Sequence, residues 1–280
     1  MLALGVGLIA ALCWGIHDIC VRYVSQHGGI LPALSMVLVL GTVFMMPISL
    51  ASGDWQDMTA RAYLLAALSG VIYTLAYVSL FNAFRIGPVR LVSPIIGAYP
   101  ALSIGHAVMM GQTVPWDQWL AVAVIMTGVG IVAVLSDASD SGGSKRAAIL
   151  WAMLGGLGFA LTFATGQNAT QAGAELPVIL ITRLAAVALT VTLLVTIGPL
   201  RFPGRSAWPF LALMGALDCI ALAVVIAAGG LDRPEFASVA ASTFGMITVV
   251  LAWAFLREKM TLGQWGGVAL TFAAIGYLAL

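Results

Sequence analysis

The sequence predicts an all-α integral membrane protein of ten transmembrane helices, arranged as two inverted five-helix repeats. Three observations support this fold class. Only 8% of the 280 residues are charged and 61% are hydrophobic, and the mean hydropathy is +1.06. Soluble domains carry roughly 25% charged residues, so this chain cannot cover a water-exposed surface. Its apolar residues also form long runs with short connections, and several residues recur at one offset in the two halves.

Apolar runs bounded by Pro, Gly and charged residues define the individual spans. A helix needs about 20 apolar residues to cross roughly 30 Å of hydrocarbon. The N-terminal run lacks the basic region and the cleavage site of a signal peptide, so we interpret it as the first span. The predicted spans are Leu2–Val24, Pro32–Ala51, Ala62–Phe84, Val89–Met110, Asp117–Ser136, Ala147–Ala169, Pro177–Gly198, Trp208–Gly229, Phe236–Leu256 and Leu262–Leu280.

A polar stretch rich in Gly, Ser and charges of both signs divides the chain. It predicts a first repeat over residues 1–136, a linker over 137–146 and a second repeat over 147–280. An odd number of spans in each repeat inserts the second copy upside down. Chance matches in apolar sequence are the alternative to duplication. The matches at an offset of 145 or 146 are Pro88 and Pro234, Gln118 and Gln264, Trp119 and Trp265, Gly130 and Gly276, and Leu31-Pro32 and Leu176-Pro177.

Basic residues in the connections predict the orientation. The even-numbered connections carry only Arg61 and Arg233, and the other basic loop residues lie in or beside the odd-numbered ones. Positively charged loops stay cytoplasmic, which predicts both termini outside. The formal net charge of +1 gives no support for nucleic-acid binding. The basic residues of the odd-numbered connections are Arg22, Arg85, Arg90, Lys145, Arg146, Arg201, Arg205, Arg257 and Lys259.

Three charged residues lie well inside predicted spans: Asp18, Arg183 and Asp218. Each costs about 2.5–3.5 kcal/mol near a helix centre, so each should face the protein interior or a water-filled cavity. Asp18 and Asp218 are candidates for binding a proton or a cation. Arg183 and Asp218 differ in depth by roughly 9 Å, which a long Arg side chain can bridge. They form either a buried ion pair or a site for a ligand of opposite charge.

The first span places Trp14, Asp18 and Arg22 on one face, because they follow at four-residue spacing. His17 lies beside this face. In the functional interpretation, Trp14 is a platform for an organic, cationic ligand, Asp18 binds a cation or proton, and His17 titrates near neutral pH. In the alternative, Asp18 pairs with Arg22, and Trp14 and His17 have structural roles.

Tyrosines at mid-depth indicate a pocket with hydrogen-bonding tips. Tyr73 and Tyr77 share a face of the third span, and Tyr99 precedes Pro100 in the fourth, where proline should bend the helix. Aromatic core packing is the alternative. The sequence contains no metal-ligand spacing, no nucleotide-binding glycine loop and no grouped catalytic set, so we expect no metal, no cofactor and no enzymatic activity.

Four segments resemble a known family. They are ALCWG at Ala11–Gly15, the stretch from Pro88 to Gly130 containing GAYPALSIGHAVMMGQTVPWDQW, its second copy FLREKMTLGQWGGVALTFAAIG, and ELPVILITRLAAVAL, which carries Arg183. Over essentially the whole chain they are similar to the drug/metabolite transporter superfamily, in its EamA-type branch. The halves differ, since Gln112 stands where the second copy has Glu258, Gly245-Met246 replaces Tyr99-Pro100, and Leu38 takes the place of Arg183. Any site between the halves is therefore asymmetric.

This resemblance implies a multi-pass transporter or exporter of a small polar metabolite, such as an amino acid or an amine-containing compound, in a bacterial inner membrane. It would work by alternating access, coupled to protons, as a monomer or homodimer in the lipid bilayer. We expect Trp14, Asp18, Tyr73, Tyr77, Tyr99 and Asp218 to bind substrate, and Asp18, Asp218 and His17 to carry the coupling. Arg183 and Glu258 are expected to be structural or to meet a substrate charge. Family members usually have cytoplasmic termini, contrary to the loop charges here. A membrane scaffold and an intramembrane enzyme are the alternatives.

Overall fold

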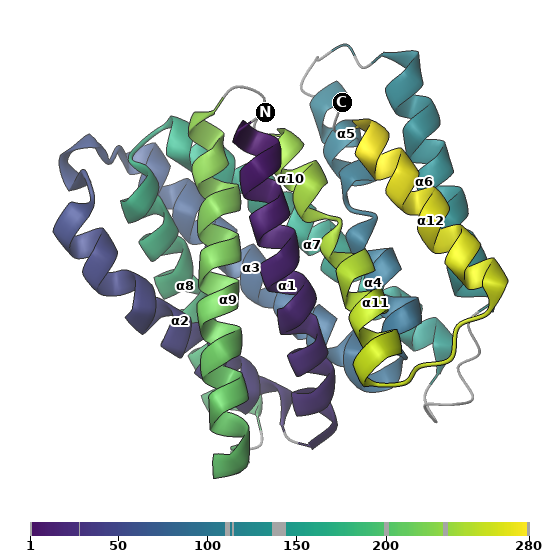
Figure 1. Ribbon diagram of the computed structural model, residues 1–280. Helices are drawn as coiled ribbons and strands as arrows, with labels where there is room; N and C mark the ends of the chain where they lie inside the picture. Colours follow the sequence, from purple (N-terminus) through teal and green to yellow (C-terminus); the bar gives the residue numbers. More distant parts are fainter. Residues whose placement is uncertain are drawn as a thin grey trace.

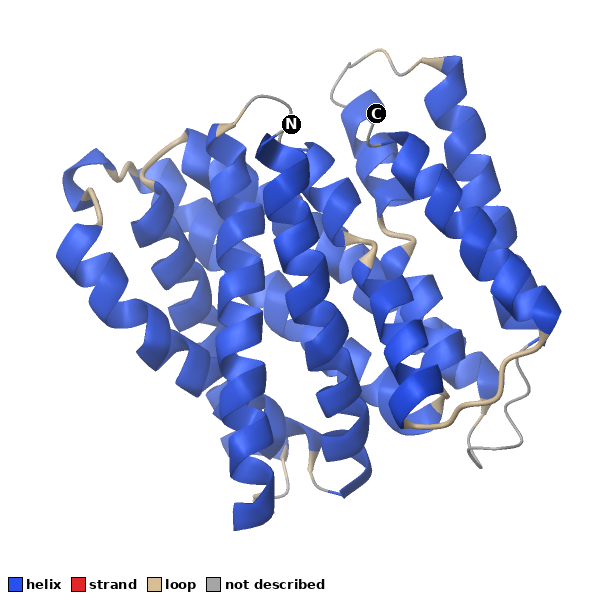
Figure 2. Cartoon of the chain, in the orientation of Figure 1, coloured by secondary structure: helices blue, strands red, loops and turns tan. Residues whose placement is uncertain are grey.

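The computed structural model describes residues 2–27, 29–109, 113, 115–135, 144–198, 202–231 and 235–278, and no strand occurs among them (Figures 1 and 2). The α-helices are α1 (Leu2–His27), α2 (Ile30–Ser52), α3 (Ala60–Ile86), α4 (Val89–Gly97), α5 (Pro100–Met109), α6 (Trp116–Leu135), α7 (Lys145–Gln171), α8 (Glu175–Ile197), α9 (Trp208–Ala227), α10 (Glu235–Ala241), α11 (Phe244–Phe255) and α12 (Leu262–Leu278). Short 3-10 turns are η1 (Trp55–Asp57), η3 (Arg205–Ala207) and η4 (Ala228–Gly230).

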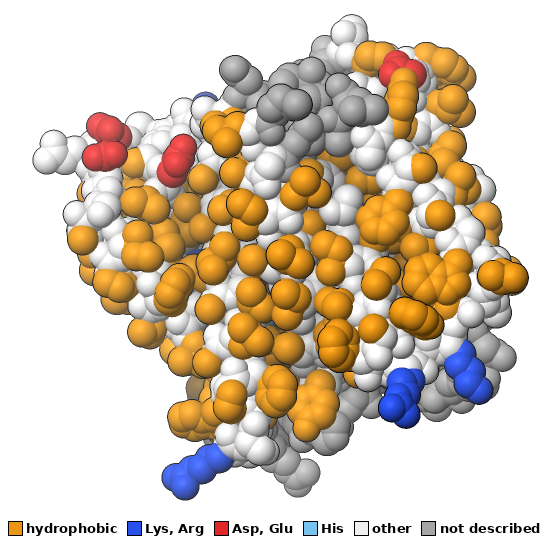
Figure 3. All heavy atoms as spheres, in the orientation of Figure 1, with side chains coloured by type: hydrophobic (Ala, Val, Ile, Leu, Met, Phe, Trp, Pro, Cys, Tyr) orange, Lys and Arg blue, Asp and Glu red, His pale blue; other side chains and the backbone are white. Residues whose placement is uncertain are grey.

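Within the described part of the chain, seven helical stretches are long and apolar enough to cross a membrane. Helices suit this environment because all their backbone groups are hydrogen-bonded within the segment. On the face that Figure 3 shows, large apolar side chains cover the middle, the acidic side chains lie near one end, and most of the basic side chains lie near the other. The molecule is therefore an all-helical, multi-pass membrane protein.

Two of the predicted spans are not continuous helices. The fourth divides into α4 and α5 at Ala98–Tyr99, directly before Pro100, which confirms the predicted disruption at that proline. The ninth divides into α10 and α11 at Ser242–Thr243, so the prediction of an unbroken ninth helix is wrong. No proline lies at this second break. Instead, the hydroxyls of Ser242 and Thr243 donate to the carbonyls of Val239 and Ala240, and such local bonds compete with the helical ladder.

The expected linker overlaps the start of α7. Residues 137–143 lie outside the described part of the chain. Ser144 caps α7 by accepting from the Ala147 backbone N–H at 3.4 Å, and Lys145 and Arg146 form the first turn. Helix α7 corresponds to the sixth predicted span, and it begins at Lys145, before the predicted boundary at Ala147.

The helices pack in a pattern that is unchanged when the two halves are exchanged. Helix α3 packs on α7 and α8, and correspondingly α9 packs on α1 and α2. Helix α4 packs on α7, as α10 and α11 pack on α1, while α2 contacts α8 and α6 contacts α12 (Figure 1). Each half therefore contributes equivalent helices to the shared interior.

The two broken helices cross at a point of close backbone approach. A Cβ atom on Gly245 of α11 would overlap the carbonyl oxygen of Ser93 on α4, and one on Gly97 would press on the Ser242 carbonyl. Small residues allow such an approach between helices in lipid, where packing rather than the hydrophobic effect drives association.

We expect Gly245→Ala to lower the free energy of unfolding by about 1–3 kcal/mol, because the added methyl group overpacks this crossing. Gly266→Ala is the matched control, since a Cβ on this α12 glycine meets nothing within 4 Å; it should be neutral or stabilising by up to about 1 kcal/mol. Unfolding in mixed micelles, followed by circular dichroism, measures both. Equal stability of the two variants would contradict the close approach.

Candidate functional site

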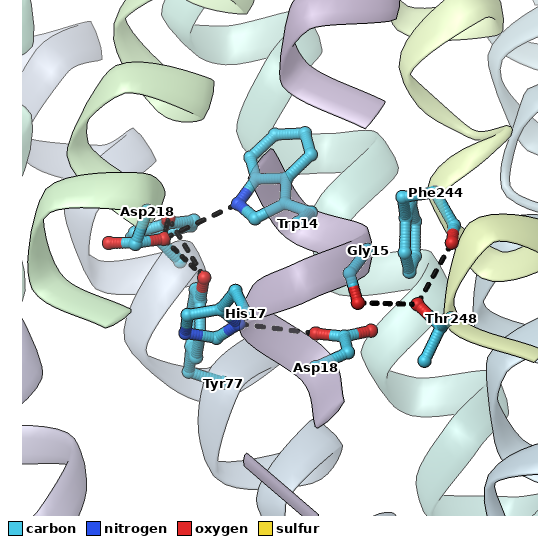
Figure 4. Close-up of polar contacts among 9 residues, drawn as sticks. Trp14, Gly15, His17, Asp18, Tyr77, Asp218, Phe244 and Thr248 are labelled. Atoms are coloured by element: carbon cyan, nitrogen blue, oxygen red, sulfur yellow. Dashed lines mark hydrogen bonds and ion pairs between the residues drawn. The ribbon is translucent and has the colours of Figure 1, made fainter. Parts of the chain in front are cut away.

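The buried carboxylate of Asp218, near the middle of α9, is the centre of a polar cluster. Its Oδ1 accepts from the hydroxyls of Tyr73 and Tyr77 on α3, and from Trp14 Nε1 on α1 at 3.4 Å. Its Oδ2 accepts from Arg183 Nη1 on α8 at 3.1 Å. Both sides of this ion pair are fully buried. The structure thus brings together five of the predicted residues, from four helices and both halves. Figure 4 shows Trp14, Tyr77 and Asp218 of this cluster.

Arg183 reaches Asp218 through a narrow gap between α2 and α9. A Cβ on Gly41 would overlap the Arg183 guanidinium, and Gly41 and Gly215 bring the backbones of α2 and α9 close together. Of the two interpretations of Arg183 and Asp218, the buried ion pair is the one observed. Arg183 is absent from the lining of the nearby cavity. Its Nη1 is paired with Asp218, whereas its Nε and Nη2 are buried without a hydrogen-bond partner among the described residues.

Asp18 and His17 form a second buried pair, one turn below Trp14 on α1. His17 Nδ1 lies 3.2 Å from Asp18 Oδ1, and the rings of His17 and Tyr77 are perpendicular, with centroids 5.7 Å apart. Asp18 Oδ2 and His17 Nε2 are both buried without a hydrogen-bond partner among the described residues. The alternative Asp18–Arg22 ion pair is not formed, because Arg22 donates to the backbone carbonyls of Phe84 and Gly87. Figure 4 shows His17 and Tyr77 between the two carboxylates.

Aromatic rings enclose a small cavity beside Asp18. Trp14 stacks on Phe163 with centroids 5.3 Å apart and meets Phe244 edge-on at 6.2 Å. Tyr77 meets Phe159 edge-on at 5.4 Å. The residues that line the cavity are Trp14, Asp18, Tyr77, Leu80, Tyr99, Phe159, Phe163 and Phe244. Asp18 is the only charged residue among them.

Four of the lining residues were missed by the sequence analysis: Leu80, Phe159, Phe163 and Phe244. Phe159 and Phe163 are one turn apart on α7 and share a face. That spacing was visible, but in a helix that is apolar all round it does not show which face points inward.

The cavity is nearly closed in this structure. The space open to the centre of a water-sized sphere is about 10 Å³, roughly enough for one water molecule. Tyr99, at the break between α4 and α5, closes one side, and its hydroxyl donates to the Ser238 carbonyl on α10 at 2.6 Å. A metabolite could enter only after these helices move.

Glu258 lies at the basic end of the molecule, away from the cavity. Its two carboxylate oxygens accept from the backbone N–H groups of Val89 and Arg90 at the start of α4, each at 3.0 Å. Arg257 precedes it with φ 54°, a left-handed conformation that ends α11 and directs Glu258 toward α4. Glu258 therefore joins the second half to a helix N-terminus of the first, where a carboxylate is favourable.

The described residues contain no group of three or more His, Cys, Asp or Glu side chains that could hold a metal ion. Cys13, Cys20 and Cys219 are buried free thiols. The chemistry of the site is therefore that of a carboxylate, an imidazole and aromatic rings.

Comparisons with known proteins agree with this architecture. A family model described as the EamA-like transporter family matches the chain twice, over residues 1–134 and 146–280. A solved crystal structure superposes with a TM-score of 0.71 at 14% identity, over 99% of this chain and 96% of that chain. At this identity the likeness shows the fold alone. No curated protein matches the sequence.

We expect Arg183→Met to lower the free energy of unfolding by about 3–5 kcal/mol, because it leaves the buried Asp218 carboxylate without a counter-charge. Adding Asp218→Asn should recover part of this loss, since the uncompensated charge then disappears. Denaturation in mixed micelles provides the measurement. A double variant less stable than Arg183→Met alone would show that Asp218 is not organised by this ion pair.

Glu258→Ala should cost about 1–2 kcal/mol of stability, because two backbone N–H groups at the start of α4 lose their acceptors. Glu258→Gln keeps one acceptor oxygen, so it should lose less stability than Glu258→Ala. The midpoints of thermal unfolding in detergent give the order of the three proteins. If Glu258→Gln and Glu258→Ala lower the midpoint equally, the carboxylate acts through its charge and not through paired hydrogen bonds.

Proposed function

The chain belongs to the EamA-like transporter family, and we propose that it moves a small amine-containing metabolite by alternating access between its two halves. The observation that carries this proposal is the aromatic cavity with one charged residue, Asp18, whose Oδ2 has no hydrogen-bond partner within the described chain. An ammonium group would supply the missing partner.

Three properties of the cavity favour a cation over an anion. The faces of Trp, Tyr and Phe rings attract cations by about 0.5–2 kcal/mol each, more when water is excluded. The carboxylate of Asp18 adds a charge-assisted hydrogen bond. Arg183, the residue that would attract an anion, is held by Asp218 outside the cavity wall. A zwitterionic amino acid would leave its carboxylate without a cationic partner, so an amine fits better.

We further propose that the ten predicted spans form two inverted repeats, with α4–α5 and α10–α11 each acting as one broken span. The packing pattern supports this, because exchanging the halves maps each packed pair of helices onto another. Broken helices near the membrane centre are typical of binding sites in transporters. In this scheme the structure is a closed state, since its cavity has room for about one water molecule.

Asp18 is the coupling residue in this proposal. Its carboxylate would bind either a proton or the substrate ammonium group, so that one displaces the other. The Nδ1 atom of His17 lies within hydrogen-bonding distance of Asp18 Oδ1, and the His17 ring contacts Tyr77. The hydroxyl of Tyr77 in turn donates to Asp218. Asp218, which was also a candidate for coupling, already accepts from four donors. We therefore assign Asp218 to organising the site.

The distribution of charge supports an orientation with both termini outside. Arg85 ends α3, Lys145 starts α7, and Arg205 lies in η3 before α9, all at the same end as Glu258. Asp57 and Asp117 mark the opposite end. Because basic segments stay in the cytoplasm, the Glu258 end would face the cytoplasm.

Transport by Asp18→Asn tests the proposal. In proteoliposomes with an imposed pH gradient, we measure the uptake of a small amine such as propylamine above that of protein-free liposomes. We expect this protein-dependent uptake to fall at least tenfold in the variant, about 1.4 kcal/mol or more, and to lose its response to the gradient. Asp54→Asn, at an exposed position between α2 and α3, is the matched control. Unchanged rate and pH dependence in Asp18→Asn would overturn the assignment.

A further inference from the structure

A second, larger space lies on the outer side of Tyr99. This groove has about 230 Å³ open to the centre of a water-sized sphere, far more than the closed cavity beside Asp18. Its walls come from the α4–α5 break, from Met126 on α6 and from Met153 and Gly156 on α7. Among the described side chains that line it, only Tyr99 is polar, so this part of the groove suits hydrocarbon.

The groove lies within the apolar depth of the protein and faces outward. Met153 is eight residues into α7, which places it roughly 12 Å along the helix from the basic end. Leu102, Met126 and Met153 on its rim are 45%, 53% and 58% exposed. In a multi-pass membrane protein, apolar side chains exposed at this depth contact lipid tails and not water. The groove therefore opens sideways to the bilayer.

Tyr99 connects the groove with the closed cavity, because it lines both. Its ring packs against Phe163, with centroids 5.4 Å apart, and is nearly parallel to Phe244 at 6.5 Å. It follows Ala98 at the point where the helix is interrupted. One aromatic residue thus separates a cation-binding enclosure from an apolar space of ample volume.

We propose that this groove is a subsite for the apolar tail of an amphiphilic amine, whose ammonium group binds beside Asp18. The inference rests on the proposed function, since it takes the cavity as the site of the ammonium group. It extends that function by assigning the chemical class of substrate, an amine with an alkyl chain, and by adding a route of entry from the bilayer. Only the Tyr99 ring stands between the two spaces. A movement of this ring would let one molecule occupy both, which favours a substrate tail over the acyl chain of a membrane lipid.

The test is direct binding of radiolabelled propylamine and decylamine to the protein in nanodiscs, measured by equilibrium dialysis with empty nanodiscs subtracted. In the wild type, we expect affinity to increase about fourfold for each methylene group that enters the groove. Met153→Trp should fill the groove and weaken decylamine binding at least tenfold, with propylamine changed less than twofold. Leu154→Trp is the matched control: Leu154 is 53% exposed on the same helix but does not line the groove.

Met126→Trp, on the opposite wall, should reproduce the effect of Met153→Trp. Equal losses of decylamine binding in Met153→Trp and Leu154→Trp, or none in either, would overturn the groove assignment while propylamine binding and its loss in Asp18→Asn still upheld the amine site. If propylamine does not bind, and decylamine and decanol both bind in a manner that depends on Met153, the amine site fails and the groove holds a lipid-like chain. That result would overturn this inference as well.

Discussion

A buried carboxylate sets the relative positions of the central helices. Asp218 on α9 accepts from Trp14 on α1, from Tyr73 and Tyr77 on α3, and from Arg183 on α8. An uncompensated charge in this low-dielectric interior would cost several kcal/mol, so the four helices are stable together only in the register that brings every donor to the same carboxylate. The aromatic cavity depends on this register, since Trp14 and Tyr77 are both part of its wall.

The two halves supply equivalent helices but different chemistry. Arg183 belongs to the second half, and the place it would occupy in the first is taken by Leu38, which is fully buried. If both halves carried an arginine here, a single carboxylate could not balance them. The asymmetry leaves Asp18, on the first helix, as the charged residue that meets the cavity. The family model matches each half of the chain once, and the differences between the halves leave Asp18 of the first half as the charged residue in the cavity wall.

Sequence reasoning predicted the helical membrane class, the three intramembrane charges and the shared face of Tyr73 and Tyr77, because each depends on composition or on helical spacing. It did not predict that Phe159 and Phe244 line the cavity, since aromatic residues in uniformly apolar helices give no contrast between inner and outer faces. The break at Ser242–Thr243 has no proline to mark it. The contact of Glu258 with Val89 spans 169 positions, and no local pattern encodes such a pairing.

Opening of the cavity is constrained by where the broken helices are held. At the basic end, Glu258 binds the first backbone N–H groups of α4, and Arg22 binds the carbonyls that end α3. Beyond the cavity, the Tyr99 hydroxyl donates to the Ser238 carbonyl on α10. Opening the cavity toward the basic end must separate the helices held by Glu258 and Arg22. It therefore breaks several charge-assisted bonds, which are about twice as strong as neutral ones. The hydrogen bond between Tyr99 and Ser238 joins two neutral groups, so breaking it costs less than breaking a charge-assisted bond at the basic end.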